Sequence, residues 1–272
     1  MSEFTVERAG VELAGEEAGD GIPVVLLHGL TATRRYVVMG SRALERSGHR
    51  VVSYDARGHG RSTPATAPDD YGYETLAADL LAVLDDRGIE RAVLAGASMG
   101  AHTIVRLALD HGDRAVGVVL ITPAYTPAGE HTDLGRWDAL ADGLRDGGVE
   151  GFVEAYGDPG VPEAWRATVT KVLRQRLSAH EHPDAVADAL RAVPRSRAFD
   201  GWAELHELEL PALVVASRDE ADPGHPYAVG ERYAREIPGA ELVSEEPGAS
   251  PLAWQGGQLS KRIAALAERA AA

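Results

Sequence analysis

A glycine-flanked serine near residue 100 has the surroundings that nucleophilic chemistry needs. Residues 96–100 read G-A-S-M-G, between an apolar stretch at 92–95 and a helical pattern that begins at residue 101. In a strand–turn–helix context, G-x-S-x-G holds its serine on a sharp bend with the hydroxyl exposed at the carboxyl end of the strand. The bend is so tight that Gly96 and Gly100 must lack side chains. The helix amino terminus stabilises developing negative charge, so we expect Ser98 to be a nucleophile.

The elements that must position this serine alternate between strands and helices. Two loosely alternating segments, 4–7 and 11–13, predict an antiparallel hairpin at a sheet edge. The next expected strands are continuous apolar runs of the kind buried in parallel sheets, at residues 22–27, 51–54, 92–95 and 116–121. The expected helices lie between them, at residues 42–48, 73–87 and 101–111. This order predicts an α/β fold with a mainly parallel sheet and helices on both faces.

The pattern changes after residue 123, where strand-like segments stop. Only helical patterns follow, at residues 137–144, 149–156, 163–180 and 184–193. Strand patterns return at 210–216 and 241–243, and a terminal helix is expected at 259–271. We therefore predict a core made of residues 1–122 and 208–272, interrupted by a helical insertion at residues 123–207.

Several motifs in the right order resemble those of the α/β-hydrolase superfamily over nearly the whole chain. Residues 26–30, L-L-H-G-L, resemble its strand-to-loop HG motif, and residues 55–62, D-A-R-G-H-G-R-S, resemble its D-x-R-G-x-G-x-S segment. The helical insertion resembles the family's cap, and residues 210–226 resemble its acid-bearing strand and loop. The resemblance implies an α/β-hydrolase fold and hydrolysis of a small carboxylic ester or lactone through an acyl-enzyme on Ser98.

The resemblance also implies an oxyanion hole made of backbone N–H groups. One donor should be Met99, the residue after the nucleophile, and the other should be Leu30, in the loop after the HG motif. Such donors stabilise the oxyanion of a tetrahedral intermediate. His28 and His59 lie inside the two other motifs, and we interpret both as structural residues that hold their loops.

The catalytic acid should lie just beyond the strand at 210–216. Two aspartates compete there. Asp222 is favoured because residues 222–226 resemble the family's D-P-x-x-P pattern, and Asp219 is the alternative. Either choice gives the chain order serine and then acid that this fold uses.

The position at which the family keeps its catalytic histidine is occupied by Ala249. Residues 247–252 read P-G-A-S-P-L and otherwise fit the histidine turn that precedes the terminal helix. Alanine cannot accept the proton of Ser98, and serine is a weak nucleophile without an activating base. Three explanations stay open: another histidine substitutes, the protein has lost hydrolysis and binds a small ligand, or an engineered replacement has silenced the enzyme.

Several histidines could supply the substitute base. His225 is the first candidate because it lies beside the acid loop, at the same end of the sheet as the nucleophile. His102 is the second, one helical turn after Ser98. Further candidates lie on or near the predicted cap, namely His131, His180 and His182.

Composition and charge narrow the classes of partner. The chain has 272 residues, a formal net charge of -15 and no cysteine. An acidic surface repels nucleic acids and anionic membranes, and the absence of cysteine excludes thiol chemistry. The amino terminus lacks an apolar signal segment, so a cytoplasmic location is expected.

No phosphate-binding motif follows the first parallel strand, and His180 and His182 are too close for metal ligands on one helix face. We predict a small-molecule substrate without cofactor or metal, and the sequence is silent on oligomeric state.

Overall fold

One sheet of eight strands organises the computed structural model, which describes residues 1–127, 133–218 and 222–271. The strand order is β1-β2-β4-β3-β5-β6-β7-β8. The strands are β1 (Ser2–Arg8), β2 (Val11–Ala18), β3 (Ile22–Leu27), β4 (His49–Tyr54), β5 (Ala92–Ala97), β6 (Ala115–Ile121), β7 (Ala212–Val215) and β8 (Glu241–Val243). β2 pairs antiparallel with β1 and β4, and all other neighbours are parallel. The edge hairpin and the mainly parallel sheet are therefore confirmed.

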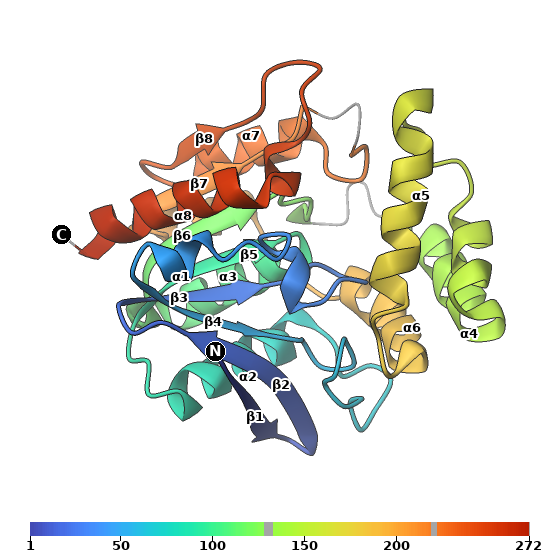
Figure 1. The fold of residues 1–272 in the computed structure, drawn as a ribbon, viewed down its shortest axis with the longest axis horizontal. Coiled ribbons are helices and arrows are strands. Elements are labelled where there is room, and N and C mark those ends of the chain that lie inside the picture. The colour runs from blue at the N-terminus through green and yellow to red at the C-terminus, as the bar shows by residue number, and fades with distance from the viewer. Residues whose placement is uncertain (128–132, 219–221, 272) are drawn as a thin grey trace.

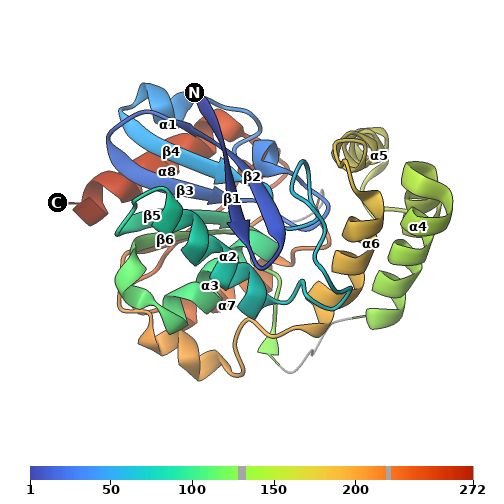
Figure 2. The same cartoon turned by 90° about the horizontal axis from the view of Figure 1, so that it is seen from below.

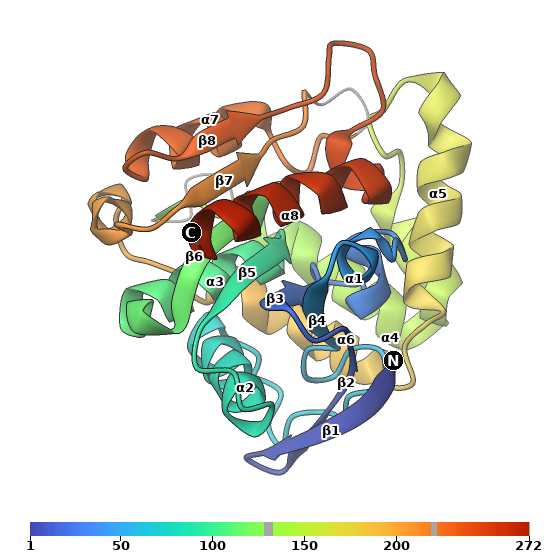
Figure 3. The ribbon, with the colours of Figure 1, turned by 60° about the vertical axis from the view of Figure 1, so that its left-hand side comes forward.

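Helices cover both faces of this sheet. They are α1 (Ala43–Arg46), α2 (Tyr73–Asp86), α3 (Met99–Asp110), α7 (Tyr227–Glu236) and α8 (Gly256–Ala271), with short 3-10 turns η1 (Arg34–Tyr36), η2 (Gly112–Arg114) and η6 (Leu252–Trp254). Figure 2 shows α1 and α8 on one side of the sheet and α2, α3 and α7 on the other. In Figure 3, α8 lies across β5 and β6 with α1 beside it. The expected α/β fold, with helices on both faces of the sheet, is confirmed by this arrangement.

The central strands need apolar residues at every position because they are covered on both sides. In β3, Val25 and Leu27 pack into the cluster that contains α2 and α3, whereas Val24 and Leu26 pack into the cluster that contains α8. Side chains alternate across a strand, so a strand between two helix layers reads as a continuous apolar run. Helix α7 was not predicted because its sequence is largely polar, and only Gly230 and Tyr233 are buried in it.

Along the chain, a group of helices is inserted between β6 and β7, which are neighbours in the sheet. They are α4 (Leu134–Tyr156), α5 (Glu163–Leu177) and α6 (Pro183–Ala192), followed by the 3-10 turns η4 (Val193–Arg195) and η5 (Trp202–Glu207). Figures 1 and 2 show α4, α5 and α6 together on one side of the molecule. Their buried apolar residues, among them Leu140, Phe152, Leu177 and Leu190, form a cluster distinct from the two that flank the sheet. The division into core and cap stays a prediction that this arrangement supports.

The helices predicted at 137–144 and 149–156 are joined into α4 by a sharp bend. Gly148 at the bend has φ 60° and ψ -147°, outside the helical region. A Cβ atom on Gly143 would lie 2.5 Å from the Gly151 carbonyl oxygen, so the two arms can approach this closely only because glycine occupies both positions. In the part of the chain that the structure describes, no helix combines the length and the apolarity needed to cross a membrane.

Candidate active site

Ser98 lies between β5 and α3 in a backbone conformation that L-residues rarely adopt. Its φ is 50° and its ψ is -112°. Such strain costs about 1–3 kcal/mol and persists only where the surroundings enforce it. The Ser98 N–H donates to the Ile121 carbonyl at 2.9 Å, and the His102 N–H donates to the Ser98 carbonyl at 3.1 Å. The side chain is partly exposed, so the sharp turn expected from the sequence is present.

Close backbone contacts explain the glycines around this serine. A Cβ atom on Gly96 would lie 2.4 Å from the Gly100 carbonyl carbon, and a Cβ atom on Gly100 would lie 2.4 Å from the Leu27 carbonyl oxygen. Neither approach is possible without moving the backbone. A Cβ atom on Gly29 would lie 3.3 Å from the Ser98 Cβ. The loop after β3 is therefore packed directly against the serine turn.

His28 orients the first peptide of that loop. Its Nε2 accepts a hydrogen bond from the Ala56 N–H at 2.9 Å, so Nδ1–H donates to the Gly29 carbonyl at 2.8 Å. The Ala32 N–H donates to the same carbonyl at 3.0 Å. In a planar trans peptide the N–H points away from the carbonyl, so these bonds set the direction of the Leu30 N–H. The structural role predicted for His28 is confirmed.

The two predicted oxyanion donors both lie beside the serine turn. Met99 is the first residue of α3, and the first N–H groups of a helix have no acceptor inside the helix. Within the described residues, no acceptor is recorded for the Leu30 N–H either. Both amides can therefore donate to a ligand oxygen, and their role as oxyanion donors stays a prediction.

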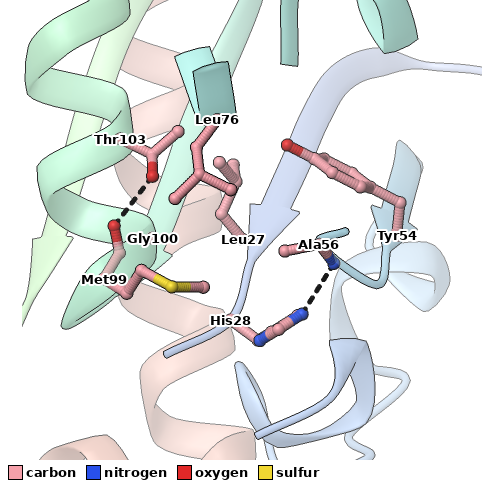
Figure 4. A pocket seen from close by; sticks show the side chains of 8 residues that line it. All are labelled: Leu27, His28, Tyr54, Ala56, Leu76, Met99, Gly100 and Thr103. Carbon is pink, nitrogen blue, oxygen red and sulfur yellow. Dashed lines mark hydrogen bonds between the residues drawn. The ribbon is translucent and has the colours of Figure 1, made fainter. Parts of the chain in front are cut away.

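A small cavity adjoins His28 and Met99. Figure 4 shows its lining, which comprises Leu27, His28, Tyr54, Ala56, Leu76, Met99, Gly100 and Thr103. Its volume is about 10 Å³, which is roughly the space that one water molecule requires. This cavity is too small to hold a substrate.

Asp222 and His225 meet on the segment between β7 and α7. The His225 Nδ1 lies 2.8 Å from the Asp222 Oδ1, and 26% and 17% of the two side chains are exposed, respectively. Burial raises the pKa of the Asp222 carboxyl, but the charge and hydrogen bond of His225 and the charge of Arg176 bring it below its usual value. An ionised carboxylate holds Nδ1 as the donor and thereby places the basic lone pair on Nε2. Asp219, the alternative acid, lies outside the described residues.

His102, the second candidate for the substitute base, is held in hydrogen bonds on both ring nitrogens. Its Nε2 accepts from the N–H groups of Ala124 and Tyr125 at 2.9 and 3.0 Å, which leaves Nδ1–H to face the Tyr73 hydroxyl at 2.9 Å. Burial, together with the charge of His225, lowers the pKa of His102 to about 3. Its acceptor nitrogen already accepts two hydrogen bonds, so the geometry does not favour His102 as the substitute base. It anchors the chain that leaves β6.

Three imidazoles meet where the loops after β3 and β4 contact the end of α5. The ring centroid of His59 lies 5.2 Å from that of His28 and 5.5 Å from that of His180. His59 donates from Nδ1 to the Arg57 carbonyl at 2.9 Å, which confirms its structural role. Burial lowers the pKa of His59 well below its usual value and that of His180 to about 4. Both ring nitrogens of His180 are in hydrogen bonds, and His131 lies outside the described residues.

Ala249 lies on an exposed turn after β8. Its N–H donates to the Glu246 carbonyl at 3.0 Å, and the preceding Gly248 has φ 78°. Glu245, just before this turn, is buried and accepts from the Ser217 hydroxyl at 3.2 Å. The carboxylate thus ties the segment after β8 to the end of β7. This turn carries no imidazole, and its correspondence to the position of the family's histidine stays a prediction.

The D-x-R-G-x-G-x-S segment forms a scaffold around these loops. The Arg57 guanidinium is fully buried and donates from Nε and Nη2 to the Asp79 carboxylate, each at 2.7 Å. Asp55 accepts from the Arg34 N–H at 2.8 Å and from the Arg61 N–H at 3.1 Å. This segment therefore links the loop after β3 to the loop after β4.

Arg176, on the cap helix α5, was not singled out from the sequence. Its Nη2 donates to the Leu30 carbonyl and to the Thr31 hydroxyl, each at 2.8 Å. An arginine in an amphipathic helix is usually a solvated residue, and no local pattern shows which distant loop it will reach.

Known proteins resemble this chain along most of its length. The family model described as alpha/beta hydrolase fold matches residues 22–157. The protein named "Putative carbamate hydrolase RutD" from Variovorax paradoxus is 32% identical over 203 residues, which cover 74% of this chain and 75% of that protein. A thermophilic esterase from Thermogutta terrifontis superposes with a TM-score of 0.79 at 25% identity, covering 99% of both chains. The enol-lactonase from Burkholderia xenovorans superposes with a TM-score of 0.77 at 26% identity, covering 97% of this chain and 99% of its own.

Proposed function

The chain belongs to the α/β-hydrolase family, and we propose that it hydrolyses a small carboxylic ester or lactone through an acyl-enzyme on Ser98. The observation that carries this proposal is the pair formed by His225 and Asp222, whose Nδ1 and Oδ1 atoms lie 2.8 Å apart. A carboxylate-held imidazole is what the serine needs as a base. The pair supplies it on the loop after β7, in a chain that has Ala249 after β8.

In the proposed reaction, Nε2 of His225 accepts the hydroxyl proton as Ser98 Oγ attacks the substrate carbonyl carbon. The carbonyl electron pair moves to oxygen, and the N–H groups of Leu30 and Met99 stabilise the resulting oxyanion. When the carbonyl re-forms, the bond to the leaving oxygen breaks, and the His225 imidazolium gives its proton to the leaving alcohol. A water molecule, deprotonated by the same imidazole, then attacks the acyl carbon, and the imidazolium gives this proton to Ser98 Oγ as the acyl–Oγ bond breaks and the carboxylic acid leaves. Asp222 stabilises the imidazolium in both steps.

The placement of this base is supported by topology and by electrostatics. Ser98 follows β5 and His225 follows β7, and the carboxyl ends of parallel strands meet at one edge of a sheet. The charge of His225 lowers the pKa of His102, which lies one helical turn after the serine. This influence agrees with a position of His225 near the amino-terminal end of α3.

The proposed substrate class agrees with the names of the relatives. An esterase, an enol-lactonase and the protein named "Putative carbamate hydrolase RutD" are among them. Esters, lactones and carbamates all react through attack on a carbonyl carbon. A small-molecule substrate therefore fits the chain. The cytoplasmic location and the absence of a nucleic-acid or membrane partner stay predictions.

The variant Ser98→Ala tests the proposed function. We expect the rate of hydrolysis of short aryl esters and simple lactones to fall at least about 10³-fold, because removal of a nucleophile abolishes the acyl-enzyme route. Ser178→Ala is the matched control, since Ser178 is exposed at the carboxyl end of α5, and it should keep the parent rate. Full activity of Ser98→Ala would contradict the proposal.

Ligand binding without catalysis is the second candidate function, and Ala249 at the histidine position favours it. A protein of this kind would turn over neither aryl esters nor lactones above the buffer rate. In calorimetric titrations, Ser98→Ala would then bind the same compounds as tightly as the parent. Turnover that disappears in Ser98→Ala would exclude this second function.

A further inference from the structure

Two residues of the cap reach the loop that carries the Leu30 amide. Arg176 lies in the last turn of α5, and His180 follows the end of that helix. Arg176 Nη2 donates to the Leu30 carbonyl and to the Thr31 hydroxyl, each at 2.8 Å. His180 donates from Nε2 to the Thr31 carbonyl at 3.0 Å. The cap therefore bonds to two successive carbonyl groups of this loop.

Each peptide at the start of the loop is held by a different donor. The Gly29 carbonyl is held by His28, the Leu30 carbonyl by Arg176 and the Thr31 carbonyl by His180. A trans peptide is planar, so fixing a carbonyl oxygen also fixes the direction of the N–H in the same peptide. The core thus sets the peptide that contains the Leu30 N–H, and the cap sets the next two peptides.

Thr31 shows why the loop needs these bonds. Its φ is 65°, a left-handed conformation that is a genuine outlier for a β-branched residue. The cost of such a conformation is about 1–3 kcal/mol unless the surroundings compensate for it. The surroundings here are cap side chains, because Arg176 binds the threonine hydroxyl and His180 binds its carbonyl. Without these bonds, we expect the backbone of Thr31 to relax. The peptides before it would then rotate, including the one that contains the Leu30 N–H.

The end of α5 is itself fixed on the core. His180 Nδ1 accepts from the Gly60 N–H at 2.8 Å, and the Glu181 N–H donates to the Gly60 carbonyl at 2.9 Å. The Nε of Arg176 is buried without a hydrogen-bond partner among the described residues, so the guanidinium is held by the loop oxygens that Nη2 binds. This docking leaves the two cap residues little freedom to shift relative to the loop.

We propose that Arg176 and His180 are positioning residues that hold the oxyanion loop, residues 28–33, in its catalytic conformation. The cap helix α5 then contributes to the oxyanion hole without touching the substrate. This inference rests on the proposed hydrolysis at Ser98. In that reaction, the bonds from the cap to the loop would keep the Leu30 N–H directed at the oxyanion.

The test compares two substitutions of the same type on the same helix. Arg176→Gln removes the donor to Leu30 and Thr31, whereas Arg174→Gln removes an exposed guanidinium that pairs with Glu150 at 2.8 Å. For an aryl ester, we expect Arg176→Gln to lower kcat about tenfold to hundredfold with little change in KM, because a misplaced donor affects the transition state. Arg174→Gln should leave both constants unchanged.

A transition-state readout separates positioning from general stability. A trifluoromethyl ketone forms a tetrahedral oxyanion adduct with an active serine, whereas the corresponding alcohol binds without reacting. We expect Arg176→Gln to weaken inhibition by the ketone by the same factor as kcat and to leave inhibition by the alcohol unchanged. Arg176→Lys, which keeps a donor and a charge, should recover part of the loss.

His180→Gln provides a second variant if Arg176→Gln does not fold. It removes the imidazole bonds to Thr31 and Gly60, and the same selective loss of ketone affinity is expected, with circular dichroism confirming the fold. Parental kcat and ketone affinity in a folded variant of either residue would overturn the inference. If Ser98→Ala is inactive at the same time, the proposed function stands and only the cap contribution is wrong. If Ser98→Ala is active, the proposed function itself is wrong.

Discussion

The turn that carries Ser98 and the turn that carries Ala249 follow strands of the same sheet, but they are packed very differently. A Cβ atom on Gly100 would lie 2.4 Å from the backbone of β3, whereas a Cβ atom on Gly248 would meet nothing within 4 Å. The first turn is packed against β3 and the loop that follows it, and the second is exposed. Packing therefore constrains the nucleophile and the oxyanion donors, while little in the fold constrains the residue type at position 249. The base can be supplied from another loop without loss of the architecture.

The largest effect should come from adding bulk to the packed turn. Gly100→Ala places its Cβ against the Leu27 carbonyl oxygen, and we expect the free energy of unfolding to fall by about 3 kcal/mol or more, because β3 would have to move. Esterase activity should fall with it, since the serine turn would be displaced. Urea denaturation and an ester assay measure the two effects.

Gly112→Ala is the matched control for this prediction. A Cβ atom on Gly112 would meet nothing within 4 Å, and the free energy of unfolding should change by no more than about 0.5 kcal/mol. Equal losses in the two variants would show that the serine turn is no more tightly packed than an exposed turn.

A second prediction concerns the exposed turn. In a His225→Gln background, Ala249→His should raise esterase activity at least about tenfold, because it supplies a general base where the family keeps one. In the native background the gain should be smaller if His225 is the base, as proposed. Ala249→Gln in the His225→Gln background is the control without basicity. An absence of gain in the double variant would mean that the turn after β8 no longer directs its side chain to Ser98.

A third prediction concerns how stability depends on pH through two buried histidines, His102 and His180. Burial lowers the pKa of His102 to about 3 and that of His180 to about 4, from an ordinary value of 6.5. As the pH falls below 6.5, the unfolded chain binds protons that the folded protein does not, so stability is lost. The loss for each such histidine is about 1.4 kcal/mol between about pH 7.5 and about pH 5.5.

Urea denaturation at the two pH values measures this loss directly. His102→Gln removes one of the titrating groups, and its stability should differ between the two pH values by about 1.4 kcal/mol less than that of the parent. A difference equal to that of the parent would show that His102 is protonated in the folded protein.

The fold and the serine turn could be predicted because their signals are local. The G-x-S-x-G turn depends on contacts that neighbouring residues make, and the parallel strands depend on continuous apolar runs. The Asp222–His225 pair is also local, since three positions separate the two residues. The contacts of His102 could not be predicted, because closeness to Ser98 along a helix does not reveal that its Nε2 accepts from backbone N–H groups of residues 124 and 125.

Contacts between distant segments could not be predicted in the same way. Arg176 bonds to loop residues that lie 146 and 145 positions earlier in the chain. The amphipathic pattern of α5 predicts a helix, but it does not predict which loop a polar side chain on that helix will reach. The bonds from the end of α5 to residues 30 and 31 therefore became visible only in three dimensions.

The central claim is that His225, held by Asp222, activates Ser98, and the rate of serine labelling tests it most directly. A fluorophosphonate probe reacts with activated serines, and mass spectrometry of the labelled peptide identifies the site. We predict that the native protein is labelled at Ser98 and that His225→Gln is labelled at least about 10²-fold more slowly at neutral pH, because the general base is gone. Labelling of folded His225→Gln at the native rate would contradict the claim.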